Sequence, residues 1–337
     1  MNEEYKKIFA SLKEEKLDFR VNGKVLIIDG LNTFLRSFTV IRHINYSGNH
    51  IGGLTGFLRS LGYLINLVKP SRVIVVFDGQ GGSTNKRYIY PEYKANRGIN
   101  RVTNWDGFES QQEESEAIIN QVIRLVYYLK CLPVDLLSID KIEADDVIGY
   151  ITQKLDGEVI IASSDKDYLQ LINDRVLVYS PVKRKFYNSD LVIQEYKATP
   201  NNFLTQKILL GDAGDNVPGV KGLGAKTLEK HFPMLKENVT ITYQDIVDMC
   251  KDGTAKIHRS IEQFYFQMEI NRKLMDLKNP NIPEEAQLEI DYVVENPNKE
   301  FESAAFAELY KEDKLGDAIP NVSSWLWNHF TELKQYK

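Results

Sequence analysis

The chain has 337 residues, 43% of them hydrophobic and 26% charged, and a formal net charge of −5. This composition is typical of a globular protein of one or two domains. The longest apolar runs are about five residues, too short to cross a bilayer. The cysteines, Cys131 and Cys250, are too few for a disulfide framework. The charged N-terminus has no apolar signal segment, so we expect no membrane association and a cytoplasmic location.

Three apolar runs are typical of strands in a parallel sheet that helices cover on both faces, and each run ends in an aspartate. These runs are residues 25–29, 73–78 and 159–165. In such sheets the ligand site lies beyond the carboxyl ends of the strands. We therefore expect Asp29, Asp78 and Asp165 to meet at one edge of the sheet.

Segments with helical spacing alternate with these strands. Helices are expected at 53–68 and 112–130 and from Glu143, and two short strands, 176–179 and 184–187, flank a basic turn. That turn, which contains Arg184, is interpreted as a solvated hairpin tip or a minor backbone contact. The alternation predicts an α/β fold with a mixed, mainly parallel sheet flanked by helices. We divide the chain into a helical extension (1–22), an α/β domain (23–190) and a helical region (191–337).

The stretch 79–110 has no sustained period and is rich in glycine, asparagine, tyrosine and basic residues. Unpatterned loops of this length, about thirty residues, are usually functional or disordered. Lys94 and Arg97 are candidates for contacting a phosphate backbone, and Tyr93 for stacking on an unpaired base. The alternative is a solvated charged loop, which is the usual fate of such runs.

Further acids join the three at the strand ends. Local roles as helix caps, first-turn acids or turn residues would explain each acid separately. Together they repel one another, by roughly 4 kcal/mol for two unit charges about 4 Å apart at an effective dielectric of 20, so a cation is needed. Carboxylates without histidine select Mg²⁺ or Mn²⁺. The nine candidate ligands are Asp29, Asp78, Glu143, Asp145, Asp146, Asp165, Asp167, Asp212 and Asp215.

Such a set of carboxylates suits hydrolysis of a phosphodiester with two metal ions. One ion lowers the pKa of a bound water, and the other stabilises the charge that grows on the leaving oxygen. This chemistry requires no protein nucleophile. The sequence shows no recognisable Ser–His or Cys–His pairing, although it does not exclude one.

The segment 211–227 is rich in glycine and lysine. Its glycine spacing is one residue away from a Walker A motif and no apolar strand precedes it, so we reject a P-loop. We interpret it as a helix–hairpin–helix motif at about 203–232, which directs backbone N–H groups at a phosphate of DNA. The alternative is a helix connection without a ligand. The candidate DNA contacts are Gly219, Lys221, Gly222, Gly224 and Lys226.

Six motifs occur in the order of the 5′-nuclease (flap endonuclease) superfamily, which the chain resembles over about 25–227. This superfamily includes the 5′-nuclease domain of bacterial DNA polymerase I and phage 5′-exonucleases. Further segments, with the N-terminal extension, resemble the ribonuclease H branch found in T-even phages. The six motifs are Ile-Ile-Asp29-Gly, Phe-Asp78-Gly, Tyr93-Lys-Ala-Asn-Arg97-Gly, Ile-Glu143-Ala-Asp-Asp146, Ser-Ser-Asp165-Lys-Asp167 and Gly-Asp212-Ala-Gly-Asp215-Asn-Val-Pro-Gly-Val.

The resemblance implies a role for each matching residue. It assigns Lys94 and Arg97 to the base of a helical arch, about 79–110, where they engage the scissile phosphate. It makes the hairpin a helix–three-turn–helix that grips duplex DNA, with a K⁺ ion held at Asn216–Gly224. It places Asp29, Asp78, Glu143, Asp145 and Asp146 in a first metal region, and Asp165, Asp167, Asp212 and Asp215 in a second.

We therefore expect a Mg²⁺-dependent 5′-3′ exonuclease or flap endonuclease that removes RNA primers or 5′ flaps during DNA replication. Its expected substrates are branched, nicked or RNA-primed duplex DNA, cut near single-strand/duplex junctions. We expect a monomer, in the cytoplasm of a bacterium or of a phage-infected host, with a single-strand-binding protein or a sliding clamp as partner. One rival is a PIN-type ribonuclease of single-stranded RNA, which the hairpin disfavours. Another is a DNA-binding replication protein without activity, which the intact acid set disfavours.

Overall fold

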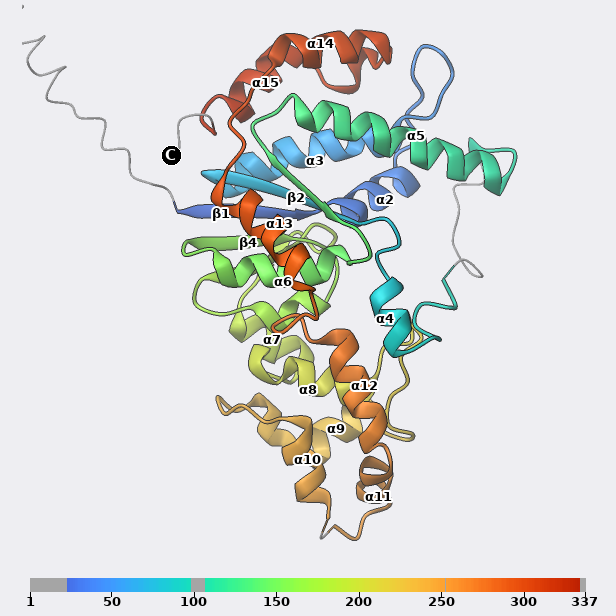
Figure 1. Cartoon of the computed structure of the whole chain (residues 1–337), viewed down its shortest axis with the longest axis vertical. Helices are drawn as coiled ribbons and strands as arrows, with labels where there is room; N and C mark the ends of the chain where they lie inside the picture. The colour runs from blue at the N-terminus through green and yellow to red at the C-terminus, as the bar shows by residue number, and fades with distance from the viewer. Residues whose placement is uncertain (1–22, 98–106, 252, 334–337) are drawn as a thin grey trace, which may run out of the picture.

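A six-stranded sheet forms the centre of the molecule (Figure 1). The structure, a computed structural model, describes residues 23–97, 107–251 and 253–333, so the expected N-terminal helical extension lies outside the described residues. The first five strands are parallel and the last is antiparallel to its neighbour, which confirms the mainly parallel sheet. In spatial order the strands are β3 (Asp135–Ile139), β2 (Arg72–Asp78), β1 (Lys24–Asp29), β4 (Glu158–Ala162), β5 (Val176–Ser180) and β6 (Lys185–Tyr187).

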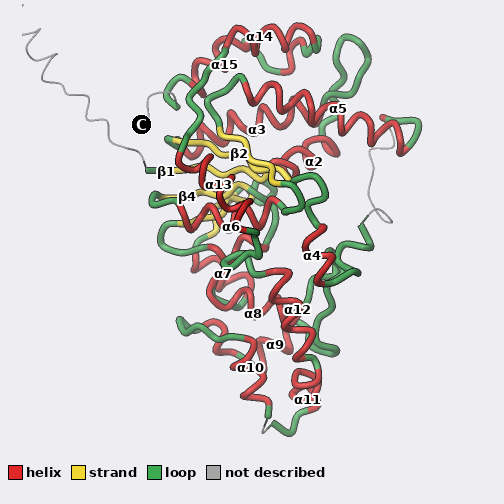
Figure 2. Tube along the Cα trace, in the orientation of Figure 1, coloured by secondary structure: helices red, strands yellow, loops and turns green. Residues whose placement is uncertain are grey.

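Both faces of the sheet are buried under helices, as Figure 2 shows for the strands in yellow. Along β1, Leu26 and Ile28 belong to the core on one face, whereas Val25 and Ile27 belong to the core on the other. This double burial explains why the strand is apolar at every position from Val25 to Ile28. None of the described helices is both long and apolar enough to span a membrane.

One face is covered by α2, α3 and α5, together with the last helices of the chain. Phe306 of α14 and Phe330 of α15 are fully buried and share a core with Phe57 of α3. The end of the chain thus returns to the sheet layer after passing through the helical region. The bounds are α2 (Gly30–Val40), α3 (Gly52–Val68), α5 (Gln111–Lys130), α14 (Ser303–Glu312), a short 3₁₀ turn (Gly316–Ala318) and α15 (Val322–Phe330).

The other face packs against a second core, to which α6, η2, α7 and α13 contribute together with Phe203 of the later helix α8 (Pro200–Leu210). Ile148 of α6 and Ile290 of α13 have no exposed surface in this core. The elements are α6 (Ala144–Lys154), the 3₁₀ turn η2 (Asp167–Leu171), α7 (Ser189–Tyr196) and α13 (Glu284–Glu295).

A third core joins the helices beyond the sheet and includes Tyr93 from the predicted arch. Within the stretch expected to be unpatterned, α4 (Thr84–Ile89) forms and contacts α12, while residues 98–106 lie outside the described part. The predicted hairpin connects α8 to α9. The helices are α8 (Pro200–Leu210), α9 (Ala225–His231), the 3₁₀ turn η3 (Pro233–Lys236), α10 (Tyr243–Cys250), α11 (Lys256–Gln263) and α12 (Tyr265–Met275).

The parallel register brings the carboxyl ends of β1, β2 and β4 to one edge. Asp29 is opposite Val76 of β2, and Ile28 is opposite Ala162 of β4. The next residue after β2, Gly79, passes so close to β3 that a Cβ atom there would lie 1.7 Å from the carbonyl oxygen of Ile139. Glycine is therefore required directly after the strand-ending Asp78.

Candidate active site

Asp29 ends β1 and also caps α2, because its Oδ1 accepts a hydrogen bond of 3.1 Å from the backbone N–H of Asn32. Its Oδ2 accepts from the hydroxyls of Ser163 at 3.0 Å and Tyr168 at 3.2 Å. Burial, with repulsion from Asp78, raises the pKa of Asp29 to about 6.

Asp78 ends β2 and accepts a 2.9 Å hydrogen bond from the backbone N–H of Ala144, at the start of α6. This bond links the strand end to the helix that carries the next acids. Burial raises the pKa of Asp78, and repulsion from Asp145 and Glu143 adds to the rise.

Glu143, Asp145 and Asp146 form a cluster in which the carboxylate oxygens lie within 4.8 Å of one another. The buried Lys86 of α4 contacts all three, at 2.9, 3.3 and 3.0 Å respectively. Burial alone would raise the pKa of Glu143, but Lys86 and Lys94 outweigh it and lower that pKa to about 2. Burial dominates at Asp146 and raises its pKa to about 7 despite Lys86.

A cavity of about 160 Å³ opens where these elements meet. Asp146 does not line this cavity and instead borders a small neighbouring space together with Lys86. The structure thus brings four of the five acids expected in the first metal region, with one from the second, to a common space. The acids that line the cavity are Asp29, Asp78, Glu143, Asp145 and Asp165.

A second cavity, of about 640 Å³, adjoins the first and is lined by Asp165, Asp167 and Asp212. Asp165 lines both cavities. Lys207 of α8 pairs with Asp167 and lies 2.9 Å from Asp212. Burial raises the pKa of Asp167 to about 7 even though Lys207 opposes the rise. The acids therefore form two adjoining groups, each with a buried or nearly buried lysine.

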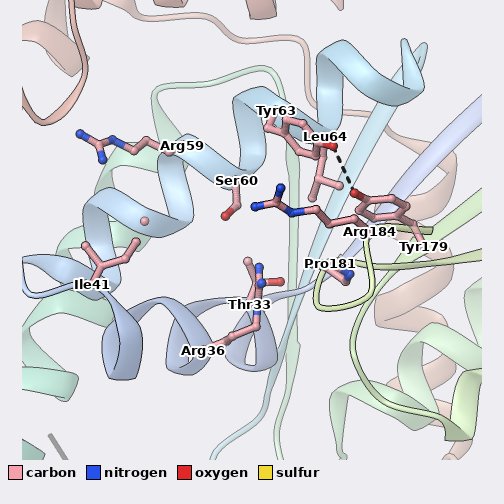
Figure 3. A pocket seen from close by; sticks show the side chains of 11 residues that line it. Thr33, Arg36, Ile41, Arg59, Ser60, Tyr63, Leu64, Tyr179, Pro181 and Arg184 are labelled. Carbon is pink, nitrogen blue, oxygen red and sulfur yellow. Dashed lines mark hydrogen bonds between the residues drawn. The ribbon is translucent and has the colours of Figure 1, made fainter. Parts of the chain in front are cut away.

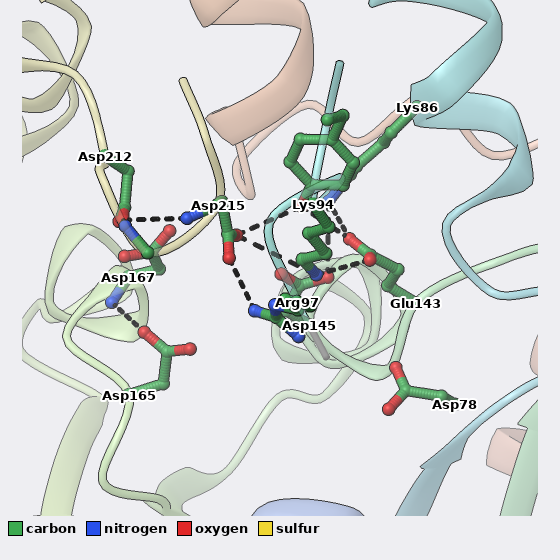
Figure 4. A network of polar contacts seen from close by, with 12 residues as sticks. Asp78, Lys86, Lys94, Arg97, Glu143, Asp145, Asp165, Asp167, Asp212 and Asp215 are labelled. Atoms are coloured by element: carbon green, nitrogen blue, oxygen red, sulfur yellow. Dashed lines mark hydrogen bonds and ion pairs between the residues drawn. The ribbon is translucent and has the colours of Figure 1, made fainter. Parts of the chain in front are cut away.

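Asp215 stands apart from both cavities and holds the base of the arch (Figure 4). It pairs with Arg97 at 2.5 Å and lies 3.8 Å from Nζ of Lys94. The Lys94 ammonium also pairs with Glu143. Lys94 and Arg97, the residues predicted to bind a phosphate, both line the first cavity, and carboxylates hold them there.

Tyr93 is 2% exposed and donates its hydroxyl to Glu143 at 2.9 Å. Its ring lies under the ammonium groups of Lys94 and Lys86, 4.9 and 5.9 Å from its centroid. We expected this ring to stack on an unpaired base, but the structure offers no exposed ring at this position. Tyr93 orients Glu143 and supports the two lysines instead.

The predicted DNA contacts of the hairpin are of two kinds, a glycine packed inside the protein and residues exposed on its surface. A Cβ atom on Gly219 would lie 2.0 Å from the carbonyl oxygen of Leu210, so this glycine is needed for packing within the protein. Around Gly222 and Gly224 there is open space. Lys221, Gly222, Gly224 and Lys226 are exposed, as a DNA-binding surface requires.

Two lysines of the site were not among the predicted site residues. Lys86 lies within the unpatterned basic stretch 79–110, and it is separated from Asp145 by 59 positions, so no local spacing connects them. Lys207 lies just before Asp212 in the sequence, and that proximity was a usable signal.

Comparisons with known proteins identify the family of this chain. The family model of the 5′-3′ exonuclease N-terminal resolvase-like domain matches residues 24–197. A 5′-3′ exonuclease of Aquifex aeolicus (strain VF5) is 28% identical over 301 residues, which are 84% of this chain and 98% of the relative. One of Bacillus subtilis (strain 168) is 28% identical over 269 residues, which are 76% and 83% of the two chains. The chain belongs to the 5′-3′ exonuclease family, which confirms the superfamily that its six motifs indicate.

A solved structure of the bacteriophage T5 D15 flap endonuclease, in complex with DNA and metal ions, is also similar. The match has a TM-score of 0.61 and 20% identity, and it covers 90% of this chain and 99% of that chain. At this identity the likeness shows the fold, so the expected 5′-nuclease fold is confirmed.

Proposed function

We propose that this chain is a structure-specific 5′ nuclease that depends on divalent metal ions and cuts branched, nicked or RNA-primed duplex DNA. One observation carries the proposal. Seven of the nine expected carboxylates line two adjoining cavities, five in one and three in the other, with Asp165 in both. No histidine or cysteine lines either cavity.

The donor set fits hard divalent cations, because Mg²⁺ and Mn²⁺ prefer carboxylate oxygens. Burial is the main cause that raises the pKa values of Asp29, Asp78 and Asp165, so keeping these carboxylates ionised costs free energy that a bound cation would offset. We assign one ion to Asp29, Asp78, Glu143 and Asp145, and a second to Asp165, Asp167 and Asp212. Bound there, the ions would supply an activated water and stabilise the leaving oxygen.

The protein's own cations would position the scissile phosphate. Lys94 and Arg97 line the cavity and are held by Glu143 and Asp215, so an incoming phosphate finds them already oriented. Tyr93 fixes both Glu143 and the Lys94 ammonium. The three residues therefore form a preorganised support at the base of the arch.

The hairpin between α8 and α9 would bind the duplex. Its exposed backbone at Gly222 and Gly224 and its exposed lysines, Lys221 and Lys226, suit phosphate contacts. The side-chain amide of Asn271 ties the hairpin to α12 through the carbonyls of Ile208 at 2.9 Å and Pro218 at 2.8 Å. The K⁺ ion at Asn216–Gly224 stays a prediction, as do the monomeric state, the cytoplasmic location and a clamp or single-strand-binding partner.

The test is cleavage of a 5′-labelled flap in Mg²⁺ or EDTA. Asp165→Asn should abolish Mg²⁺-dependent cleavage, because Asp165 lines both cavities. Asp156→Asn is the matched control, since Asp156 is exposed just before β4, at the opposite end of the strand that precedes Asp165. Cleavage by Asp165→Asn at the rate of the control would contradict the proposal. Cleavage of single-stranded RNA but no branched DNA would favour the ribonuclease.

A further inference from the structure

Lys207 of α8 is a nearly buried cation whose two partners are both expected ligands of the second metal ion. Its ammonium group pairs with Asp167 and lies 2.9 Å from Oδ2 of Asp212, and its side chain is 11% exposed. The backbone N–H of Asp167 donates to Oδ1 of Asp165 at 2.9 Å, so the third expected ligand belongs to the same group (Figure 4). One ammonium group thus already neutralises part of the negative charge that would attract the second ion.

The acids expected to bind the first ion include two without such a cation. Asp29 accepts hydrogen bonds from two hydroxyl groups and a backbone N–H, and Asp78 accepts one from the backbone N–H of Ala144 at 2.9 Å. In the part of the chain that the structure describes, neither carboxylate forms an ion pair. An ion that binds to Asp29 and Asp78 therefore displaces no ammonium group from them.

Helix α8 keeps Lys207 beside the second group of acids. Ile208 and Leu209, the next two residues of the helix, are buried in the third core. The carbonyl of Lys207 accepts a 2.7 Å hydrogen bond from the backbone N–H of Gly211, which ends the helix directly before Asp212. Because its backbone is fixed in this way, the ammonium group cannot diffuse away when an ion arrives, as a counterion from solution would.

We propose that Lys207 competes with the second metal ion, so that the second site binds its ion more weakly than the first site and is filled last. The inference rests on the proposed function, which assigns a second ion to Asp165, Asp167 and Asp212. Positive charges a few ångströms apart repel each other, and most strongly where burial limits screening by water and salt. An arriving ion has to displace the ammonium group from Asp167 and Asp212 or bind beside it, and either event lowers its affinity. Lys207 is thus assigned control over the loading of the second site.

The test is isothermal titration calorimetry of the metal-free protein with Mn²⁺ in the absence of DNA, so that cleavage plays no part. The wild type should bind two ions with different affinities. Lys207→Met should tighten the weaker binding about tenfold or more, because the competing charge is gone, and leave the tighter binding nearly unchanged. A purely structural role of Lys207 predicts the opposite, a weaker second ion. Lys207→Arg keeps the charge and should bind both ions as the wild type does.

Two control variants also remove one positive charge. Lys166 lines the same cavity, is exposed and forms no ion pair with any residue that the structure describes. Arg184 extends from the β5–β6 turn into the space between α2 and α3, in a pocket whose lining contains no carboxylate (Figure 3). Because water and salt screen exposed charges, Lys166→Met and Arg184→Met should each change the affinity of the weaker ion less than about threefold.

An unchanged weaker affinity in Lys207→Met, or equal tightening in Lys166→Met, would overturn the inference and leave the proposed function in place. Loss of the second ion in Lys207→Met would show that the lysine supports the site, which also contradicts competition. A wild type that binds fewer than two ions would overturn the assignment of the second ion and the inference with it. If circular dichroism shows that metal-free Lys207→Met is unfolded, Lys207→Gln carries the test, because its amide retains a hydrogen-bond donor without the charge.

Discussion

The ammonium group of Lys86 lies 2.9 Å from Oε2 of Glu143, and both side chains are buried. The same ammonium lies 3.3 Å from Asp145 and 3.0 Å from Asp146. One positive charge therefore faces three carboxylates in a poorly solvated place. Lys86 offsets only part of this negative charge, and the remainder is available to attract metal ions.

Without Lys86, the repulsion among the three carboxylates should lower the stability of the protein. Lys86→Met should destabilise the metal-free protein by about 3–5 kcal/mol, which is typical when one partner of a buried ion pair is lost. Mg²⁺ should restore part of the loss, because the ion supplies the missing positive charge. Urea denaturation with EDTA and with Mg²⁺ measures both effects.

The control for this variant is Lys24→Met, which breaks the partly exposed pair of Lys24 with Glu158. Such pairs contribute about 0–1 kcal/mol, so little change is expected, with or without Mg²⁺. Equal stability losses in the two variants would show that Lys86 does not neutralise the acid cluster.

Stability should also depend on pH through Asp29. Its folded pKa is about 6, mainly because of burial, whereas an unfolded aspartate has a pKa near 3.9. Between about pH 4 and pH 6 the folded protein holds a proton that the unfolded chain has released, so the metal-free protein loses stability as the pH rises. A shift of about two units corresponds to a loss on the order of 3 kcal/mol.

Asp29→Asn removes this titration and should flatten the decline between pH 4 and pH 6 in EDTA. The variant should then be more stable than the wild type at pH 7 without metal. Because metal ligands must be deprotonated, stabilisation of the wild type by Mg²⁺ should increase over the same interval. Identical pH profiles of the two proteins would contradict the proposed charge state of Asp29.

Lys94 should act on the rate more than on binding. Its ammonium is fixed by Glu143 and Tyr93 inside the catalytic cavity, so Lys94→Ala should lower single-turnover cleavage about 10²–10³-fold, as the loss of one preorganised donor typically does. Lys130→Ala at the exposed end of α5 serves as the control. A loss confined to DNA affinity, with an unchanged rate at saturating enzyme, would assign Lys94 to binding alone.

Substitutions at two glycines of the hairpin should affect protein stability and DNA affinity separately. Gly219→Ala should destabilise the protein, because its Cβ atom would collide with the carbonyl of Leu210. Gly224→Ala should leave the melting temperature unchanged, since open space surrounds it and its φ of −101° suits alanine. It should nevertheless weaken duplex binding several-fold by separating the backbone from a phosphate. Unchanged affinity in Gly224→Ala would argue against a hairpin contact at this position.

The position of the acids at one edge of the sheet could be predicted from the sequence, whereas their contacts with Lys86 and Tyr93 could not, and the reason is physical. Asp29, Asp78 and Asp165 follow apolar strands, and parallel strands must end at a common edge. Lys86 contacts acids that lie 57–60 positions later in the chain. The contact depends on how α4 packs in the folded protein, and the periodicity of the sequence does not predict that packing. The burial of Tyr93 has the same origin, because it depends on helices that follow much later.

Elements of the fold were missed for similar reasons. Strand β3 has the sequence Asp-Leu-Leu-Ser-Ile, which is short, only partly apolar and without a regular alternation. Helix α2 follows directly upon β1 without a turn. The return of α14 and α15 to the sheet was also not predictable, because an apolar helix face does not specify what it packs against.

The position of the cut relative to the single-strand/duplex junction tests the proposed function most directly. A set of 5′-labelled flaps that differ only in flap length should be incubated with the wild type and Mg²⁺, and the products sized. The labelled product should lengthen with the flap, because the cut follows the single-strand/duplex junction. Products of constant length, or cleavage that persists in EDTA, would contradict a metal-dependent nuclease that recognises the junction.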